Sequence, residues 1–324
     1  MHASHLLGAI AFIGSALAPA GAQAQVYPDK PVRVIVPFAA GGTTDIIARV
    51  VSAQITAELG HPMIVDNKGG AGGMIGATEI AKATPDGYTL GVATVSTTAC
   101  VPAINPKVPY NALTDFTSII NIAATPNVIA VHPSFPAKDH KAFLAALKAN
   151  PDKYSYASSG TGGIGHLQME LYKSLTGAQV THIAYRGAGP ALNDVISGQV
   201  PMIFDNLPSA LPFIKDGRLI AIAVAAPQRL PMLPNVPTFK ELGLEPVNRM
   251  AYYGIHGPKG LSKEVVAKIS TAVKKTLEKP DVRKRIEETG SIIIANTPEQ
   301  FAEQTRAEYE VYRKVVEQQK LKFE

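Results

Sequence analysis

The sequence has a single cysteine, Cys100, among its 324 residues. An intramolecular disulfide is therefore excluded, even in a compartment where disulfides form readily. A chain of this length can bury a large hydrophobic core without such a crosslink. No Cys-His pattern typical of a catalytic thiol surrounds Cys100, so we expect it to be a small buried residue.

Long apolar runs are absent beyond the N-terminus. Residues 1–24 contain no Asp, Glu, Lys or Arg, and Leu6–Ala18 form an apolar stretch of signal-peptide length, too short to span a membrane. Ala22–Ala24 matches the cleavage pattern A-x-A, so we expect cleavage after Ala24. An uncleaved anchor or a disordered N-terminus is the alternative. We therefore expect a soluble protein in an extracytoplasmic compartment that does not itself span a membrane.

Catalytic and metal-binding motifs are also missing. The nucleophile motif G-x-S-x-G and the zinc motif H-E-x-x-H do not occur. His166 and Glu170 stand four residues apart on an expected helix, but no third ligand accompanies them, so we expect no metal site. The net charge of +5 comes from scattered basic residues, without the interleaved aromatics of a nucleic-acid surface. These absences favour binding over catalysis and indicate no nucleic-acid partner.

Short β-rich runs alternate with helical patterns, which is typical of an α/β protein with largely parallel sheets. Further helices are expected to begin at Ser262 and at Thr297, where Thr, Pro and Gln form a capping box. The expected strands are Val32–Val36, Met63–Asp66, Tyr88–Ala93, Asn127–His132, Tyr154–Ala157, Val180–Ala184, Met202–Phe204 and Leu219–Val224. The expected helices between them include Lys138–Ala149, Ala188–Ile196 and Leu207–Ile214.

The length of the chain suits two lobes of ordinary domain size, but no linker rich in Ser, Gly or Pro separates them. Instead, extended segments near Ile119–Val131 and Met250–His256 can each run from one lobe into the other. Two crossings make the first lobe discontinuous, and they permit a hinge. We therefore expect a signal peptide at 1–24, lobe 1 at 25–125 plus 253–324, and lobe 2 at 126–252.

Two glycine-rich loops each join an expected strand to an expected helix. Ala39–Asp45 lies between Val32–Val36 and a helix over Ile46–Leu59. Ser158–Gly163 occupies the equivalent place before a helix over His166–Leu175. Such turns present bare backbone N–H groups at the positive end of a helix, which suits a carboxylate or a phosphate. Two of them suggest two lobes that close on one small anion.

Other interpretations of the glycine runs are weaker. Gly160–Gly165 matches the dinucleotide pattern G-x-G-x-x-G, but the next expected strand ends in Ala184–Arg186, without an acid for a ribose. The chain is also expected to be secreted, away from nicotinamide cofactors, so we expect no cofactor. Asp66–Gly73 lacks the Lys-Ser or Lys-Thr of a phosphate loop. We interpret it as a structural loop near the cleft, with positive φ angles that suit glycine.

Polar residues follow two further strands. Ligands of open α/β sheets bind beyond the carboxyl ends of the strands, where Ser96, Thr97, Asp205 and Asn206 are expected. The hydroxyls can donate to a ligand or cap a helix. Asn206 can donate to a carboxylate, whereas an ionised Asp205 suits an ammonium group or caps the following helix. Asp45 can contact the ligand or stabilise its own helix through the dipole.

At these loops the chain resembles the Bug-type solute receptors of tripartite tricarboxylate transporters, and the matches span nearly the whole mature chain. Gly69 and Ala184 stand where the family usually has Pro, and Tyr252 or Tyr253 where Trp is common. These departures affect loop stiffness and packing more than the ligand loops. The matching segments are Pro37–Gly42, Thr44–Asp45, Arg49, Asn67, Gly70–Gly73, Pro85–Leu90, Ser158–Gly160, His166–Leu167, Tyr185–Gly187, Gly217–Leu219 and Leu233–Thr238.

The resemblance implies a type II periplasmic binding protein with the Venus-flytrap fold. Its two lobes, each a mixed and mostly parallel sheet flanked by helices, close on a carboxylated solute and deliver it to a membrane permease. It implies no enzyme activity, and we expect a monomer. Carried over by position, with Ser96 and Thr97 added from the strand ends, the ligand-binding residues are Phe38, Gly42, Thr43, Thr44, Asp45, Ser96, Thr97, Ser159, Gly160, Thr161, Gly162, Asp205 and Asn206.

The rest of the ligand is less determined. Asp45 and Asp205 are expected to flank a pocket without an obvious Lys or Arg, which favours an amino dicarboxylate such as glutamate or aspartate. Citrate, another di- or tricarboxylate, or an aromatic carboxylate is the alternative within the same class. A periplasmic sensor partner, or a secreted α/β hydrolase or oxidoreductase, is the alternative from another class.

Overall fold

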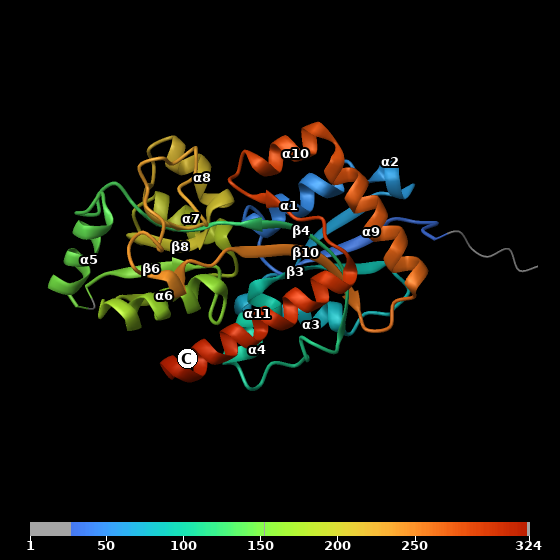
Figure 1. The fold of residues 1–324 in the computed structure, drawn as a ribbon, viewed down its shortest axis with the longest axis horizontal. Coiled ribbons are helices and arrows are strands. Elements are labelled where there is room, and N and C mark those ends of the chain that lie inside the picture. The colour runs from blue at the N-terminus through green and yellow to red at the C-terminus, as the bar shows by residue number, and fades with distance from the viewer. Residues whose placement is uncertain (1–26, 152, 323–324) are drawn as a thin grey trace, which may run out of the picture.

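The computed structural model describes residues 27–151 and 153–322. Within them the chain forms two mixed sheets, each flanked by helices, side by side in Figure 1. The expected signal peptide, residues 1–24, and its cleavage after Ala24 lie outside the described residues. None of the described helices combines the length and apolar character needed to cross a bilayer.

Lobe 1 is built on a six-stranded sheet with the strand order β11-β4-β10-β3-β1-β2. Its strands are β1 (Val32–Val36), β2 (Met63–Asn67), β3 (Thr89–Thr94), β4 (Phe116–Thr125), β10 (Ala251–Pro258) and β11 (Ile292–Ile293). Its helices are α1 (Thr43–Ser52), α2 (Thr56–Leu59), η1 (Ala71–Gly73), α3 (Met74–Ala81), η2 (Ser96–Cys100), α4 (Val101–Ile104), α9 (Lys263–Glu278), α10 (Pro280–Glu287) and α11 (Pro298–Gln319).

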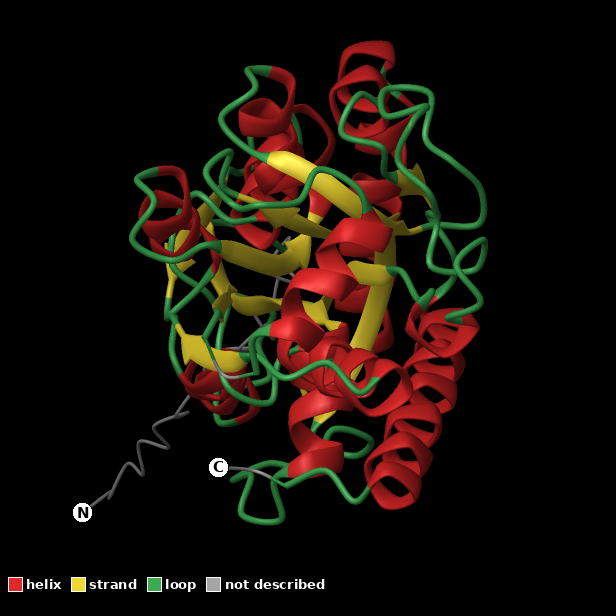
Figure 2. Ribbon diagram, turned by 90° about the vertical axis from the view of Figure 1, so that its left-hand side faces the viewer, coloured by secondary structure: helices red, strands yellow, loops and turns green. Residues whose placement is uncertain are grey.

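Lobe 2 is built on a five-stranded sheet with the order β7-β6-β8-β5-β9. Its strands are β5 (Asn127–Val131), β6 (Ser155–Ser158), β7 (Thr181–Ala184), β8 (Met202–Asn206) and β9 (Ile220–Ala225). Its helices are α5 (His140–Ala149), α6 (Ile164–Thr176), α7 (Ala188–Ile196), α8 (Leu207–Lys215) and η3 (Glu245–Val247). The strands lie inside and the helices outside (Figure 2), so the expected two-lobed α/β fold is confirmed.

The sheets are mixed, but parallel pairing does not predominate as expected. Among the described strands, β1 pairs in parallel with β2 and β3, and β6 with β7 and β8. The other pairings, which involve β4, β5, β9, β10 and β11, are antiparallel. β5 and β10 enter their sheets directly from the other lobe, without a crossover helix before them, and each pairs antiparallel with both of its neighbours.

The chain passes twice between the sheets. β4 ends at Thr125 and β5 begins at Asn127, whereas β9 ends at Ala225 and β10 begins at Ala251. β4 and β10 pair with each other in the middle of the molecule (Figure 1). The boundary expected after residue 125 lies between β4 and β5, and the one expected after residue 252 lies inside β10, so both stay predictions.

Local sequence signals account for the starts of the two helices α9 and α11. The capping box at Thr297 is confirmed, since its Oγ1 accepts from Gln300 N at 3.2 Å and Gln300 Oε1 accepts from Thr297 N at 3.0 Å. The N-cap at Ser262 is confirmed as well. The single helix expected over Ile46–Leu59 was wrong, because α1 starts earlier, after the N-cap Gly42, and a turn separates it from α2.

The hydrophobic core links the lobes. Cys100 is buried, as expected, and burial raises the pKa of its thiol. Ile164 and Leu167 at the start of α6, in lobe 2, are buried within the core cluster of lobe 1. The second glycine loop, which directly precedes α6, is thereby held against lobe 1.

Candidate ligand-binding cleft

A small cavity lies where the lobes meet, beyond the carboxyl ends of β1, β3, β6 and β8. Its volume is about 10 Å³, close to the smallest space that holds one water. Its walls are mostly hydroxyls, amides and backbone, without Lys or Arg. The sequence-predicted residues that line it are Phe38, Gly42, Thr43, Thr44, Ser96, Ser159, Asp205 and Asn206, and the residues that sequence reasoning missed are Thr94, Ala188 and Tyr253.

The first glycine loop places the N-terminus of α1 at this cavity. Gly41 has a φ of +84°, a left-handed conformation that favours glycine, and Gly42 is the N-cap without a side-chain cap. Thr43 and Thr44 follow in the first turn and are buried. The positive end of the helix therefore faces the cleft, as a carboxylate site requires.

Asp45 is turned away from the cavity into lobe 1. Its carboxylate accepts from Arg49 Nε at 2.9 Å, Asn67 Nδ2 at 3.0 Å and Gly41 N at 3.1 Å. Burial acts to raise the pKa of Asp45, but these hydrogen bonds outweigh it and lower the pKa. Asp45 thus holds the first glycine loop in shape and does not line the cavity, so it no longer supports the inference of a zwitterionic ligand.

The second glycine loop rests on two stacked histidines. The rings of His166 and His182 lie 4.2 Å apart, centroid to centroid. Gly162 N donates to His166 Nδ1 at 3.0 Å, and a 2.7 Å hydrogen bond joins His182 Nε2 to Ser158 Oγ. Burial lowers the pKa of His182 to about 3, so this ring is neutral at physiological pH. The histidines support the loop from behind.

Hydroxyls of lobe 1 meet helix N-termini of lobe 2. Ser96 Oγ accepts from Ile164 N, the first residue of α6, at 3.0 Å. Thr43 Oγ1 accepts from Ser209 N in α8 at 3.2 Å and donates to Ser209 Oγ at 3.1 Å. A backbone hydrogen bond from Ala39 N to Arg186 O, 3.0 Å long, adds to these contacts. The lobes are therefore closed on each other.

Both glycine loops reach the cavity, the first through Gly42 and the second through Ser159, and their glycines also pack closely against other segments of the opposite lobe. A Cβ on Gly42 would approach that of Ala188 at 3.3 Å, so the first loop meets the start of α7. A Cβ on Gly160 would lie 2.7 Å from Gly72 N. The second loop therefore meets the third glycine run, which is residues Gly69–Gly73 of the structural loop. Gly70, Gly72 and Gly73 have positive φ angles, which confirms the structural loop expected there.

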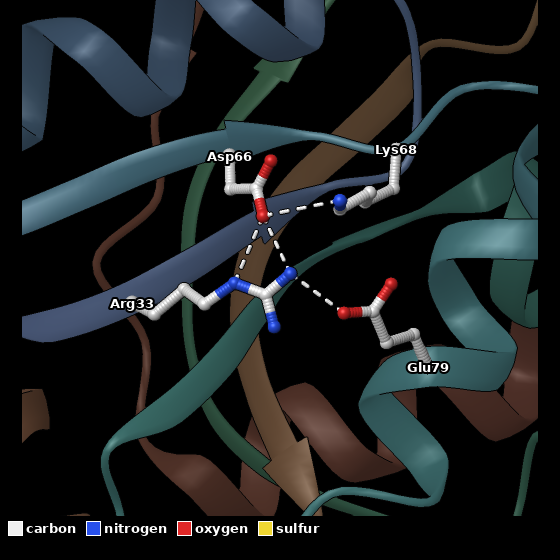
Figure 3. Close-up of polar contacts among 4 residues, drawn as sticks. All are labelled: Arg33, Asp66, Lys68 and Glu79. Atoms are coloured by element: carbon white, nitrogen blue, oxygen red, sulfur yellow. Dashed lines mark hydrogen bonds and ion pairs between the residues drawn. The ribbon is translucent and has the colours of Figure 1, made fainter.

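An ion-pair network braces this third glycine run (Figure 3). Arg33 in β1 contacts Asp66 in β2 at 2.5 Å and Glu79 in α3 at 2.6 Å, and Lys68 lies 3.6 Å from Asp66. The Arg33 guanidinium lowers the pKa of Asp66. Asp66 precedes the glycines and Glu79 follows them, so one guanidinium fixes both ends of the loop that meets Gly160.

Asp205 differs from Asp45 because its carboxylate is incompletely bonded. It is 2% exposed and its Oδ1 accepts from Asn206 N at 2.7 Å. Its Oδ2 completes no hydrogen bond of ordinary geometry with any residue that the structure describes. Burial raises the pKa of Asp205 to about 6, and hydrogen bonding from Asn206 and Ser159 opposes that rise only in part.

Asn206 has a fixed orientation. Its Oδ1 accepts from the Tyr253 hydroxyl at 2.5 Å, and its Nδ2 donates to Asn127 Oδ1. Asn127 in turn donates to Arg249 O at 2.8 Å. One of the two amide hydrogens of Asn206 is thus engaged with Asn127, and the second is the group with which it can donate to a ligand.

The other predicted residues have supporting positions. Thr97 exchanges hydrogen bonds with Thr94 within its own turn, at 3.2 Å, and so acts as a cap. Gly160 and Gly162 shape the second loop. Thr161 lines a separate, larger cavity of about 590 Å³ beside β7 and the end of α11. We favour the smaller cavity as the ligand site because it lies at the strand ends and joins both lobes.

The residues that sequence reasoning missed had weak signals. Thr94 is the last residue of β3, one position beyond the expected end of that strand. Tyr253 stood out only as a departure at a family tryptophan position, and nothing pointed to Ala188. No group of three or more potential metal ligands occurs within residues 27–151 and 153–322, where Glu170 pairs with Lys173 at 2.9 Å.

Known proteins are similar to this chain in sequence and in fold. The sequence model of the tripartite tricarboxylate transporter family receptor matches residues 47–321. Protein BugT of Bordetella pertussis is 33% identical over 302 residues, 93% of each chain. A structure of a periplasmic transporter is 50% identical with a TM-score of 0.90, over 92% of this chain and 100% of that one. The structure of MatC from Rhodopseudomonas palustris with bound malate is 33% identical and has a TM-score of 0.86. The match covers 90% of this chain and 100% of that one. These matches confirm the resemblance that the motifs indicated.

Proposed function

The chain belongs to the tripartite tricarboxylate transporter receptor family, and from this premise we propose that it captures a small dicarboxylate between its lobes for delivery to a membrane permease. It is a periplasmic solute-binding receptor and not an enzyme. We further propose that residues 1–24 are a cleaved signal peptide, that the lobes are divided after residues 125 and 252, and that the receptor is a monomer.

The composition of the cleft carries this proposal. Helix N-termini, the hydroxyls of Thr43, Ser96 and Ser159, and the Asn206 amide converge on one buried point between the lobes. Backbone N–H groups at a helix start, with neutral donors around them, suit a carboxylate. The residues that line the cavity include no His or Cys, so the wall lacks a Ser-His or Cys-His pair. The wall is therefore one for binding and not for turnover.

Closure follows from the volume of the cavity. A space of about 10 Å³ is far below the several hundred Å³ of ordinary ligand pockets. A dicarboxylate therefore enters only when the lobes move apart. The two crossings, between β4 and β5 and between β9 and β10, are the segments about which we propose that they rotate.

For the ligand itself we propose an amino dicarboxylate such as glutamate or aspartate. The Oδ2 atom of Asp205 is buried at the cleft and available to an ammonium group. The cavity wall contains no Lys or Arg that would pair with the extra carboxylate of citrate. Malate is the second candidate, because it is bound to the MatC relative.

Isothermal titration calorimetry against glutamate, aspartate, malate, adipate, citrate and nicotinate tests the proposal. We expect one dicarboxylate to bind with a stoichiometry of one per chain. Tight citrate binding without amino-acid binding would contradict the ligand assignment. Absence of binding by every carboxylate would contradict the receptor function of this cleft.

The glycine contacts give a matched pair of variants. Gly160→Ala places a Cβ 2.7 Å from Gly72 N in the opposite lobe, so it opposes closure. The control Gly243→Ala also has a positive φ, +74°, but meets nothing within 4 Å. Overpacking costs about 1–3 kcal/mol, so we expect Gly160→Ala to weaken binding about 10- to 100-fold. Equal affinities of the two variants would show that the contact between Gly160 and Gly72 does not serve binding.

A further inference from the structure

Asp205 is the acid in the wall of the cleft. Of the residues that line the cavity, Asp205 and Tyr253 have side chains that ionise. Burial raises the pKa of Tyr253 well above its ordinary value, so that side chain stays neutral. The charge of the cleft wall at physiological pH is thus set by Asp205 alone.

No cation offsets that carboxylate. Among the residues that the structure describes, no ion pair includes Asp205. Asn206 and Ser159 lie beside it, Val128 pairs with it from β5, and Tyr253 faces it from β10. In lobe 1, Asp45 is held by Arg49. The histidines behind the second glycine loop hydrogen-bond to that loop and not to Asp205.

The Oδ2 atom can serve two kinds of ligand. Ionised, it accepts a hydrogen bond from an ammonium group with added charge attraction, accepts from a hydroxyl without that attraction, and repels a nearby carboxylate. Protonated, it donates a hydrogen bond to a carboxylate or hydroxyl oxygen and has no favourable charge for an ammonium group. The buried position makes both effects strong, because solvent screens them little.

We propose that Asp205 selects the ligand class through its protonation: the ionised form takes an amino dicarboxylate and the protonated form takes a dicarboxylate without an amino group. This inference rests on the proposed function, because it assumes that the cleft binds a dicarboxylate. One cleft then accepts aspartate in neutral surroundings and malate in acidic ones.

The expected size of the effect follows from the titration of Asp205. With a pKa of about 6, its protonated fraction falls about 25-fold between pH 5.5 and 7.5, and its ionised fraction rises about fourfold. The affinity for a ligand that requires one form scales with the fraction of that form. We therefore expect the ratio of aspartate to malate affinity to rise about 100-fold over this interval.

Aspartate and malate make a matched pair of ligands, since they differ only in an ammonium or a hydroxyl group. Calorimetric titrations of each at pH 5.5 and 7.5 measure the ratio. Asp205→Asn retains an acceptor for Asn206 N but cannot ionise, so its ratio should stay constant and favour malate. Because the ligands titrate equally in both proteins, the comparison removes their own ionisation. Asp45→Asn, at a carboxylate of lobe 1 that does not line the cavity, should keep the pH-dependent ratio.

A second measurement needs no variant. In wild-type protein at pH 6, titration in two buffers of different ionisation enthalpy gives the protons exchanged on binding. We expect malate to take up about half a proton and aspartate to release about half, as a pKa of about 6 implies.

These experiments distinguish failure of the proposed role of Asp205 from failure of the proposed receptor function. Binding with a pH-independent ratio and no proton exchange would overturn the role of Asp205 and leave the receptor function standing. An unchanged pH shift in Asp205→Asn, with its fold verified by circular dichroism, would also overturn that role. Absence of binding by both ligands and by every other dicarboxylate at both pH values would overturn the proposed function and the selection with it.

Discussion

Asp45 and Asp205 are buried carboxylates on opposite sides of one cleft, and they have opposite surroundings. Asp45, in lobe 1, accepts from a guanidinium, an amide and a backbone N–H. Asp205, in lobe 2, is hydrogen-bonded by Asn206 and Ser159, but its Oδ2 atom is buried without a hydrogen bond of ordinary geometry to any residue that the structure describes. Burial acts to raise both pKa values, yet hydrogen bonding lowers that of Asp45 while that of Asp205 rises to about 6.

The difference separates scaffold from binding surface. A buried carboxylate with all its partners stabilises the segment that supplies them, here the first glycine loop. A buried carboxylate without a counter-charge costs folding free energy in its ionised form. Such a group persists where a ligand or a proton completes it, as we propose for Asp205. Lobe 1 therefore contributes a fixed wall, and lobe 2 the wall that responds to the ligand.

Removal of Asp45 should have the largest effect on stability. Asp45→Ala removes the acceptor of three hydrogen bonds, from Arg49, Asn67 and Gly41. The Arg49 side chain is 54% exposed, so water can replace part of its bond, and at about 1 kcal/mol for each hydrogen bond we expect a loss of about 3 kcal/mol. Because the pKa of Asp45 is lowered in the folded state, its contribution is present above its unfolded pKa and is lost as pH falls below about 4. Urea denaturation of the variant and the wild type, followed by circular dichroism at pH 7 and at pH 3.5, measures the loss of stability and its dependence on pH.

One result would contradict the contrast between Asp45 and Asp205. Suppose that Asp45→Ala and the wild type have the same midpoint of urea unfolding at pH 7. The three hydrogen bonds then do not stabilise the fold, and the Asp45 carboxylate is as available to a ligand as that of Asp205. Asn67→Ala offers a control, because it removes one of the donors and leaves the pairing with Arg49 intact.

Substitution of Asp205 should act in the opposite direction. Its folded pKa lies above its unfolded value, so stability falls as pH rises from about 4 to 6. Asp205→Asn removes this loss, and we expect the ligand-free protein to gain about 2–3 kcal/mol at pH 7 and almost nothing at pH 4. Urea midpoints at both pH values check it. A destabilised Asp205→Asn at pH 7 would indicate that the carboxylate has partners in solution.

The sequence predicts the helices and strands around the cleft better than it predicts which side chains meet there. Val32–Val36 and Ala188–Ile196 coincide with β1 and α7, since β-branched runs and Gly or Pro boundaries are local signals. Phe38, Ser159 and Asn206 could be placed in the cleft because ligands gather at the carboxyl ends of strands.

The rest depends on which distant segments meet. The partner of Asp45, Asn67, lies in another strand, and the meeting of Gly160 with Gly72 joins two lobes. Tyr253 reaches Asn206 from a strand near the C-terminal end of the chain. Such contacts follow from packing of the whole fold, and one sequence has no local pattern that encodes them.

The smallest effect is expected where the walls touch directly. Ser96→Ala removes the acceptor of Ile164 N, a hydrogen bond present only when the lobes are closed. A neutral hydrogen bond contributes about 1 kcal/mol, so we expect ligand affinity to fall about fivefold by calorimetry, with little change in urea stability. Thr97→Val is the control, because the Thr97 hydroxyl hydrogen-bonds to Thr94 within its own turn. This substitution should lower stability and leave affinity unchanged. A higher affinity in Ser96→Ala would instead show that Ser96 competes with the ligand carboxylate for the Ile164 amide. Lobe 1 would then respond to the ligand as lobe 2 does.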